Sequence, residues 1–290
     1  MPTVGVVSLG AMGSAVADAL VRGGADVVST LDGRSDRTAQ LSERVVSVQL
    51  LPDLEAVVRE ADVVLSIVPP ERASAAAESI LRAAREQAAR PVLVELNAIA
   101  PATAVEIQSA ASLTEVETVD GSISGPPPWK PGTTRVYLSG PRASEVAALP
   151  FEGVERIVVG DAVGSASAVK MSTASVYKGT TALLLQALLA AHENGVLEHV
   201  LADLQAAAPE LVANVERRLA SAAAKSGRYV GEMHEISAAQ SAAGLTPGLF
   251  GAMAEIYAAL ATTPAATRAP EEIGGESLGQ ILSAIRGRGA

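Results

Sequence analysis

The spacing of apolar positions along the chain changes near residue 160. Before that point, short runs rich in β-branched residues alternate with Ala-rich segments of helical spacing, which is typical of βαβ units around a parallel sheet. After Gly164 the strand pattern nearly disappears, and one long helix is expected from Ser165 to about His192. The predicted strands are Thr3–Ser8, Asp26–Leu31, Val45–Gln49, Asp62–Val68, Pro91–Leu96, Glu115–Ser122, Thr134–Ser139 and Val154–Val159.

The pattern therefore predicts two domains. Residues 1–162 are expected to form an α/β domain, and residues 163–290 an all-α domain. The tail from about Ala265 is expected to be loosely held. Breaks between the helices of the second domain are expected at Pro209, Gly227, Gly244, Pro247 and Pro264.

Composition excludes several classes of protein. The 290 residues include no cysteine, which rules out disulfide scaffolds, thiolate nucleophiles and Cys-ligated metal sites. The net charge of −10 comes without a Lys/Arg cluster, which argues against nucleic acid as the main partner. The first residues do not resemble a signal peptide, and no window approaches 18 uninterrupted apolar residues. We expect a cytoplasmic protein without a bound metal, since its three histidines are scattered, and without a membrane partner.

The strongest local pattern is a strand that runs into a glycine turn and then a helix. Ser8, Gly10 and Gly13 occupy the three glycine positions of G-x-G-x-x-G. Gly10 lets the backbone approach a pyrophosphate, Gly13 lets the helix contact the strand, and the helix amino terminus favours the anion. The pattern predicts a dinucleotide-binding Rossmann domain, followed by the all-α domain. The expected cofactor contacts in and near this turn are Ser8, Leu9, Gly10, Ala11, Met12, Gly13, Val68 and Pro69.

The residues after the second predicted strand are compatible with either NAD or NADP at the ribose 2′ position. Asp32 is the residue type that accepts from the 2′-hydroxyl of NAD, whereas Arg34 and Ser35 can donate to the 2′-phosphate of NADP. Gly33-Arg34-Ser35 is similar to a phosphate loop, so NADP is favoured over NAD. The alternative is an ordinary solvated turn.

Four segments together resemble the β-hydroxyacid dehydrogenase superfamily, which includes relatives of 6-phosphogluconate and 3-hydroxyisobutyrate dehydrogenases and the imine reductases. SLGAMGSAVADAL (8–20) resembles the signature G-L-G-x-M-G-x-x-M-A-x-x-L, and ELNAIAP (95–101) stands where the family has D-x-S-T-x-x-P. DGSISGPPPWKPGTT (120–134) resembles the substrate loop that begins D-A-P-V-S-G-G, and GSASAVKMSTASVYKG (164–179) resembles G-x-x-x-x-x-K-x-x-x-N. With GEMHEI (231–236), the pattern is most similar to a subgroup with a distinct 6-phosphogluconate dehydrogenase-like helical domain.

This resemblance implies roles for individual residues. Lys170 matches the catalytic lysine, Tyr177 is a second possible proton donor, and Asn97 takes a place near the nicotinamide ribose. Ala174 replaces the family's asparagine, and imine reductases usually carry Asp or Tyr in place of Lys170, so both branches match imperfectly. The implied substrate contacts are Ser122, Ser124, Gly125, Trp129, Thr173, Ala174, Lys178, Glu232 and His234.

The expected function is that of an NADP(H)-dependent oxidoreductase. It would transfer a hydride between nicotinamide and a small hydroxy acid or alcohol, or the carbonyl form. Imine reduction on the same scaffold and a non-catalytic NADP(H)-binding sensor are the two alternatives. A homodimer through the helical domain is also expected, because the long helix is apolar over much of its circumference. The residues that make it so are Leu183, Leu184, Leu185, Leu188 and Leu189.

Overall fold

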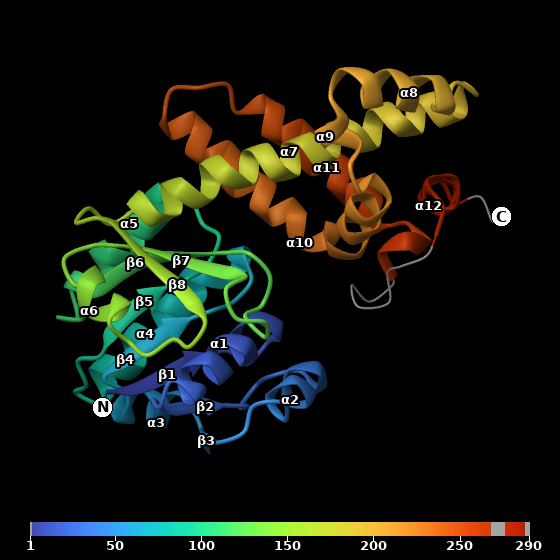
Figure 1. The fold of residues 1–290 in the computed structure, drawn as a ribbon. Helices are drawn as coiled ribbons and strands as arrows, with labels where there is room; N and C mark the ends of the chain where they lie inside the picture. Colours follow the sequence, from blue (N-terminus) through green and yellow to red (C-terminus); the bar gives the residue numbers. More distant parts are fainter. Residues whose placement is uncertain (1, 268–275, 288–290) are drawn as a thin grey trace. The chain divides into compact units, whose positions relative to one another are not determined.

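The computed structural model describes residues 2–267 and 276–287. The chain divides into two compact units, Met1–Met171 and Ser172–Ala290. Figure 1 shows the first unit in blue to yellow-green and the second in yellow to red. The boundary lies inside helix α7 (Ser165–Glu193), whereas the predicted domain boundary stood just before this helix, at residue 162.

The first unit is built on one sheet of eight strands, and all eight predicted strands are present, with ends displaced by a few residues. The strands are β1 (Thr3–Val7), β2 (Asp26–Thr30), β3 (Val48–Leu51), β4 (Val63–Ser66), β5 (Val92–Glu95), β6 (Thr118–Ser124), β7 (Thr134–Ser139) and β8 (Val154–Gly160). Their order in the sheet is β3-β2-β1-β4-β5-β6-β7-β8. The order reverses beside β1, so the carboxyl end of β1 lies where such sheets bind their ligands.

The sheet is mainly parallel, as the pattern predicts, but one pair of neighbouring strands is antiparallel. β7 runs antiparallel to β6, and β8 is parallel to β7. The connection between Ser124 and Thr134 is too short for the crossover of about a dozen or more residues that a parallel return needs. Its three consecutive prolines, Pro126–Pro128, also prevent a helix there.

Helices cover both faces of this sheet. They are α1 (Ala11–Arg22), α2 (Asp36–Ser42), α3 (Leu54–Glu60), the 3₁₀ turn η1 (Pro70–Arg72), α4 (Ala73–Glu86), α5 (Pro101–Ser112) and α6 (Ala143–Ala147). One apolar layer joins the sheet to α1 and α6, and a second joins it to α3, α4 and α5. Along β4, Val63 and Leu65 belong to the first layer and Val64 to the second, because successive side chains of a strand point to opposite faces.

The described part of the second unit is helical, as the pattern predicts. After α7 it contains α8 (Leu197–Ala207), α9 (Pro209–Val212), α10 (Val215–Ala242), α11 (Gly248–Ala261), the 3₁₀ turn η2 (Pro264–Thr267) and α12 (Leu278–Ile285). The break expected at Gly227 is wrong, because this residue lies inside the continuous helix α10. Helices α10 and α11 pack together, with Tyr229 and Tyr257 edge to face at a ring separation of 5.2 Å. No helix in the two described ranges has the length and apolar character needed to cross a membrane.

Helix α12 lies in the tail that was expected to be loosely held, and over these residues that expectation is wrong. Its amino terminus carries a capping box, in which the Ser277 hydroxyl accepts the Gln280 amide and the Gln280 side chain accepts the Ser277 amide. Such a pair satisfies two amides that the helix itself leaves without partners. Residues 268–275 and 288–290 of the tail lie outside the described part of the chain.

Candidate active site

The glycine turn joins β1 to α1 and leaves the start of the helix open. The first residue before α1 is Gly10, which offers no side chain to accept an amide, whereas α2 and α3 are capped by Ser35 and Asp53. A Cβ at Gly13 would collide with the Ser8 carbonyl, so only glycine permits this contact of helix and strand. The uncapped amides and the dipole of α1 suit a pyrophosphate, and the turn therefore fits a dinucleotide.

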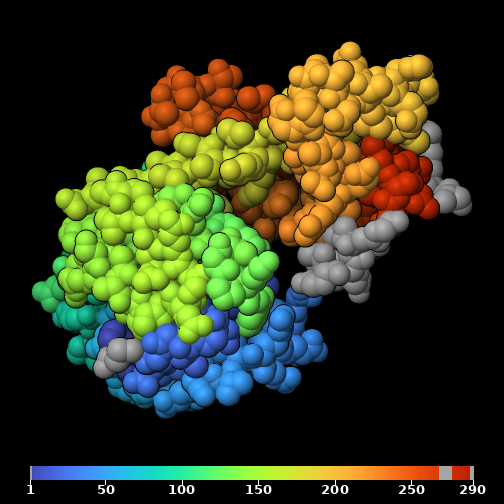
Figure 2. All heavy atoms as spheres, in the orientation of Figure 1, coloured from blue at the N-terminus to red at the C-terminus, as the bar shows by residue number. Residues whose placement is uncertain are grey.

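The turn after β2 is exposed, as Figure 2 shows for the blue segment that contains α2. Gly33 has φ of +66°, and the Arg34 amide donates to the Leu31 carbonyl at 3.0 Å, which closes a tight turn. Ser35 caps α2 by accepting the Thr38 amide at 3.3 Å. The Arg34 side chain is exposed, and within the described residues it forms no ion pair.

The predicted contacts at the ends of β4 and β5 are tied to one another. The Asn97 side chain accepts the Val68 amide at 2.6 Å and donates to the Ser66 hydroxyl at 3.1 Å. Its own amide donates to Glu95 at 2.9 Å. Asn97 is buried and its polar atoms are engaged inside the protein, whereas Pro69 is exposed. Asn97 therefore fixes the loop that follows β4.

The loop that resembles the family's substrate loop is also tied down at several points. Gly125 has φ of +114°, and a Cβ there would collide with the Thr133 carbonyl. Ser122 is buried and donates to a carbonyl of α7, while Ser124, the last residue of β6, is partly exposed. The predicted substrate contacts on this loop therefore differ in access, because the hydroxyl of Ser122 is committed to the helix.

Trp129 stands further along the same loop and contacts a distant segment. The guanidinium carbon of Arg44, which follows α2, lies 4.3 Å from the centroid of the indole ring. The ring also packs against the apolar layer that contains residues of α1, the sheet and α6. A cation over an indole face is attractive by about 0.5–2 kcal/mol. Trp129 thus ties its loop to Arg44 and to this apolar layer.

Lys170 is the sixth residue of α7 and belongs to the first unit. Its ammonium donates a hydrogen bond of 2.7 Å to the carbonyl of Ile123 on β6. Ile123 stands between Ser122 and Ser124 of the loop motif. The structure thus brings Lys170, predicted for catalysis, to the strand that carries Ser122 and Ser124, which are predicted for substrate binding.

In the second unit, two of the predicted residues form an ion pair. The Lys178 ammonium contacts the carboxylate of Glu232, a buried side chain of α10, and lies 4.7 Å from the centroid of the Tyr229 ring. Arg228 also reaches Glu232, at 3.2 Å. Tyr257 donates to the Lys178 carbonyl at 2.7 Å. This arrangement holds α7, α10 and α11 together.

The remaining predicted residues of the second unit have different surroundings. Tyr177 is 71% exposed, Ala174 is buried and Thr173 is partly buried. His234 is exposed, although Glu232, two residues earlier on α10, is buried. Residues two positions apart on a helix point in different directions, so the side chains of Glu232 and His234 do not meet.

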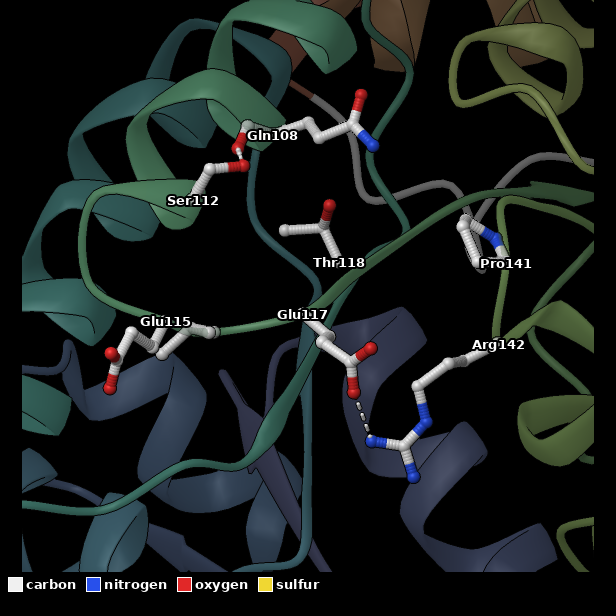
Figure 3. Close-up of a pocket in the computed structure, with 8 residues that line it drawn as sticks. Gln108, Ser112, Glu115, Glu117, Thr118, Pro141 and Arg142 are labelled. Atoms are coloured by element: carbon white, nitrogen blue, oxygen red, sulfur yellow. Dashed lines mark hydrogen bonds and ion pairs between the residues drawn. The ribbon is translucent and has the colours of Figure 1, made fainter.

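A pocket of about 250 Å³ lies elsewhere on the first unit, at the amino end of β6 (Figure 3). Arg142 at its rim is already paired with Glu117 at 2.7 Å and with Glu145. None of the residues predicted for the cofactor or the substrate lines this pocket. The lining residues are Gln108, Ser112, Glu115, Val116, Glu117, Thr118, Pro141 and Arg142.

Two buried acids near the predicted site were not identified as site residues from the sequence. Asp120 of β6 accepts several hydrogen bonds from the start of α7, and Glu95 of β5 accepts the Asn97 amide. Burial, with a smaller contribution from the neighbouring Asp120, raises the pKa of the Glu95 carboxyl to about 8. Glu95 and Asp120 both belong to segments that resemble the family's motifs, but the hydrophobic periodicity of a strand does not indicate that an acidic residue in it is buried.

Comparison with known proteins decides the family. Residues 3–148, half of the chain, match the family model described as the NAD binding domain of 6-phosphogluconate dehydrogenase. The chain belongs to the β-hydroxyacid dehydrogenase superfamily. Members of this superfamily are NAD(P)-dependent dehydrogenases and reductases, and this chain is one of them. Residues 191–260 match a domain of unknown function, DUF1932.

Solved structures agree with this assignment. A conserved protein of unknown function, noted for its similarity to 3-hydroxyacid dehydrogenases, is 30% identical, with 89% of this chain and 96% of that one covered and a TM-score of 0.67. The 3-hydroxyisobutyrate dehydrogenase of Mycobacterium tuberculosis is 20% identical, with 99% of each chain covered and a TM-score of 0.69. An imine reductase from Myxococcus stipitatus in complex with NADP⁺ is 20% identical, with 98% and 100% covered and a TM-score of 0.58. The last two share the fold of this superfamily member.

Proposed function

We propose that this member of the superfamily is an NADP(H)-dependent oxidoreductase for a small hydroxy acid or alcohol, or its carbonyl form, with Lys170 as general acid and base. The observation that carries the proposal is the position of the Lys170 ammonium, 2.7 Å from the Ile123 carbonyl on the strand of the substrate-loop motif. A lysine at the family's catalytic position is thereby held beside Ser122 and Ser124.

The cofactor would be held by the glycine turn and by the turn after β2. The uncapped start of α1 suits the pyrophosphate, and Arg34 suits a 2′-phosphate, because a charged guanidinium binds phosphate oxygens strongly. Asp32, also exposed, is the residue that would read a 2′-hydroxyl instead. When bound, the nicotinamide supplies or accepts the hydride.

Lys170 would handle the proton that accompanies the hydride. Its ammonium gives a proton to the oxygen of a carbonyl substrate, and its amine takes a proton from an alcohol in the opposite direction. The family's asparagine, four residues after the lysine, is replaced by the buried Ala174, which has no polar group to offer a hydroxy acid. This replacement favours imine reduction as the second candidate function.

The proposal includes a homodimer through the helical region. Leu184, Leu185 and Leu188 of α7 are buried within the chain, but Leu183 is 64% exposed, and Val176 and Tyr177 are exposed as well. Large apolar side chains on one long helix are a typical partner surface.

The experiment that tests the proposal combines two titrations and a substrate panel. NADPH and NADH are each titrated by fluorescence, and NADPH should bind roughly 10- to 100-fold more tightly, as expected for a charge-assisted contact. Hydroxy acids, alcohols, aldehydes, ketones and cyclic imines are then offered with the matching cofactor. Turnover of a carbonyl or hydroxy compound supports the proposal. Tighter NADH binding would assign the 2′ site to Asp32, and turnover of imines alone would make the protein an imine reductase.

A further inference from the structure

The first turn of α7 is capped by the sheet and not by a residue of its own. Gly164, directly before the helix, has φ of +100° and no side chain that could accept an amide. Asp120 of β6 accepts the amides of Gly164 at 2.9 Å and Ser167 at 3.0 Å. Ser139 of β7 accepts the Ala166 amide at 3.0 Å. Amides that a helix leaves without internal partners are thus satisfied by two strands.

Asp120 has hydrogen bonds on both carboxylate oxygens and is only 1% exposed. Besides the two amides, its Oδ2 accepts the Ser139 hydroxyl at 2.9 Å, and its Oδ1 accepts the Ser167 hydroxyl at 2.6 Å. A negative group is favoured at the amino terminus of a helix by the helix dipole. The burial of this carboxylate is therefore compensated by four donors, and its geometry is fixed from several directions.

The same strand makes two further contacts with the same face of α7. The Ser122 hydroxyl donates to the Ala166 carbonyl at 2.9 Å, and the Lys170 ammonium donates to the Ile123 carbonyl at 2.7 Å. Lys170 follows Ala166 by four residues and Ser167 by three, so the three positions share one side of the helix. The side of α7 that β6 holds is the side that carries Lys170.

We propose that Asp120 is a positioning residue, which accepts the first amides of α7, fixes that helix against β6 and so sets where the Lys170 ammonium lies. The inference rests on the proposed function only in giving Lys170 the role of acid and base. The position of the ammonium can be followed without any substrate.

The direct test is NMR of protein labelled with ¹³C at the lysine Cε, whose chemical shift follows protonation of the amine. The chain has only four lysines, Lys130, Lys170, Lys178 and Lys225, so four signals are expected, and a Lys170→Arg variant identifies the one of interest. Titrations are recorded for the wild type, Asp120→Asn and Ser139→Ala. Asp120→Asn removes both the charge and an acceptor, whereas Ser139→Ala keeps the charge and loosens the same cap.

We expect the titration midpoint of Lys170 to move by roughly half a pH unit or more in Asp120→Asn, and to move detectably in Ser139→Ala. The midpoints of Lys130 and Lys225 should stay unchanged in both variants. A shift in Asp120→Asn alone would show an effect of charge and would overturn the positioning role. An unchanged Lys170 signal in folded Asp120→Asn would do the same. If Asp120→Asn does not fold, Ser139→Ala decides by itself.

The matched control is Asp53→Ala, which removes the acceptor of the Ala56 amide at 2.8 Å and so weakens the cap of α3 in the same unit. Its thermal midpoint should fall, but the Lys170 signal should not move. If Asp53→Ala shifts Lys170 as Asp120→Asn does, the effect is a general loss of stability, and the inference is wrong.

A second measurement uses turnover once a substrate is known. In Asp120→Asn, kcat should fall about 10- to 100-fold, as expected for a displaced catalytic group, while KM and the Kd of NADPH change less than about twofold. An unchanged kcat would contradict the inference. A panel without any turnover would contradict the proposed function, and the NMR result would still decide the role of Asp120.

Discussion

Glu95 of β5 and Asp120 of β6 are direct neighbours across the sheet, and both are almost completely buried, with 2% and 1% of their surface exposed. Asp120 is surrounded by donors, but the Oε2 atom of Glu95 has no hydrogen-bond partner in the described part of the chain. Two adjacent buried carboxyls do not readily ionise together. Burial raises the pKa of Glu95 to about 8, so its protonated form is favoured at neutral pH.

This pair makes the free energy of unfolding depend on pH in a definite direction. The pKa of Glu95 is raised by burial to about 8, whereas an unfolded chain would release this proton near 4.5. Between these values the folded chain holds a proton that the unfolded chain has lost, so stability falls as the pH rises, by up to about 1.4 kcal/mol per pH unit. We expect Glu95→Gln to remove this slope. The free energy of unfolding is measured with urea at pH 5.5 and 7.5. Its fall between these two pH values should be about 2 kcal/mol smaller in Glu95→Gln than in the wild type.

The control for that experiment is Glu106→Gln, the same chemical change at an exposed position of α5. It should keep the slope of the wild type. Equal slopes in the wild type and Glu95→Gln would show that the buried acid is already ionised at pH 5.5.

Arg34→Ala should weaken NADPH binding roughly 10- to 100-fold, because a charge-assisted contact with the 2′-phosphate is lost. NADH binding should change less than about twofold, since NADH has no such phosphate. Arg82→Ala, at an exposed position of α4, is the control and should affect neither cofactor. Equal losses for both cofactors would mean that Arg34 does not read the 2′ position.

Lys170→Met should lower kcat by about 10²–10⁴-fold, the usual contribution of a positioned acid or base, and leave the Kd of NADPH nearly unchanged. Tyr177→Phe is the comparison. Tyr177 is 71% exposed, and its variant should keep most of the turnover. The opposite pattern, with Tyr177→Phe inactive and Lys170→Met active, would indicate a proton donor of the imine-reductase kind.

Leu183→Glu should convert a dimer into monomers at micromolar concentration, as measured by light scattering, because a charge would then enter an apolar interface. Leu113→Glu provides the control, since Leu113 is 88% exposed at the end of α5 in the other unit. That variant should remain dimeric. A monomeric wild type would refute the predicted assembly at once.

The sequence predicts the fold well where local signals and packing agree. The segment around Val63, for example, is a short apolar run between two helical segments, and it forms the buried strand β4. Each of the eight runs predicted as strands in the first unit forms a strand in the structure. The alternation of strands and helices does not indicate the reversed direction of β7, because the same alternation continues past Ser124. The proline-rich connection to Thr134 was the available signal, since it leaves no room for a crossover helix. The capping pattern of Ser277 and Gln280 could likewise have predicted α12.

The candidate site was predicted less completely, for a physical reason. The motif around Gly10 and the lysine at position 170 are local in sequence and could be recognised. Asp120, in contrast, acquires its role from Gly164 and Ser167, which are 44 and 47 residues away in the chain. The protonation of Glu95 depends on burial by the whole sheet, and no pattern of residue types contains that information.

Trp129 is the chain's single tryptophan, and its ring lies under the guanidinium of Arg44. Light absorbed at the red edge of the protein band therefore excites one indole, on the loop of the substrate motif. A nearby cation shifts the wavelength of indole emission, so separation of the indole ring from Arg44 would change the emission maximum of the protein. The protein thus contains its own optical probe of the contact between this loop and Arg44, and fluorescence can follow that contact without any attached dye.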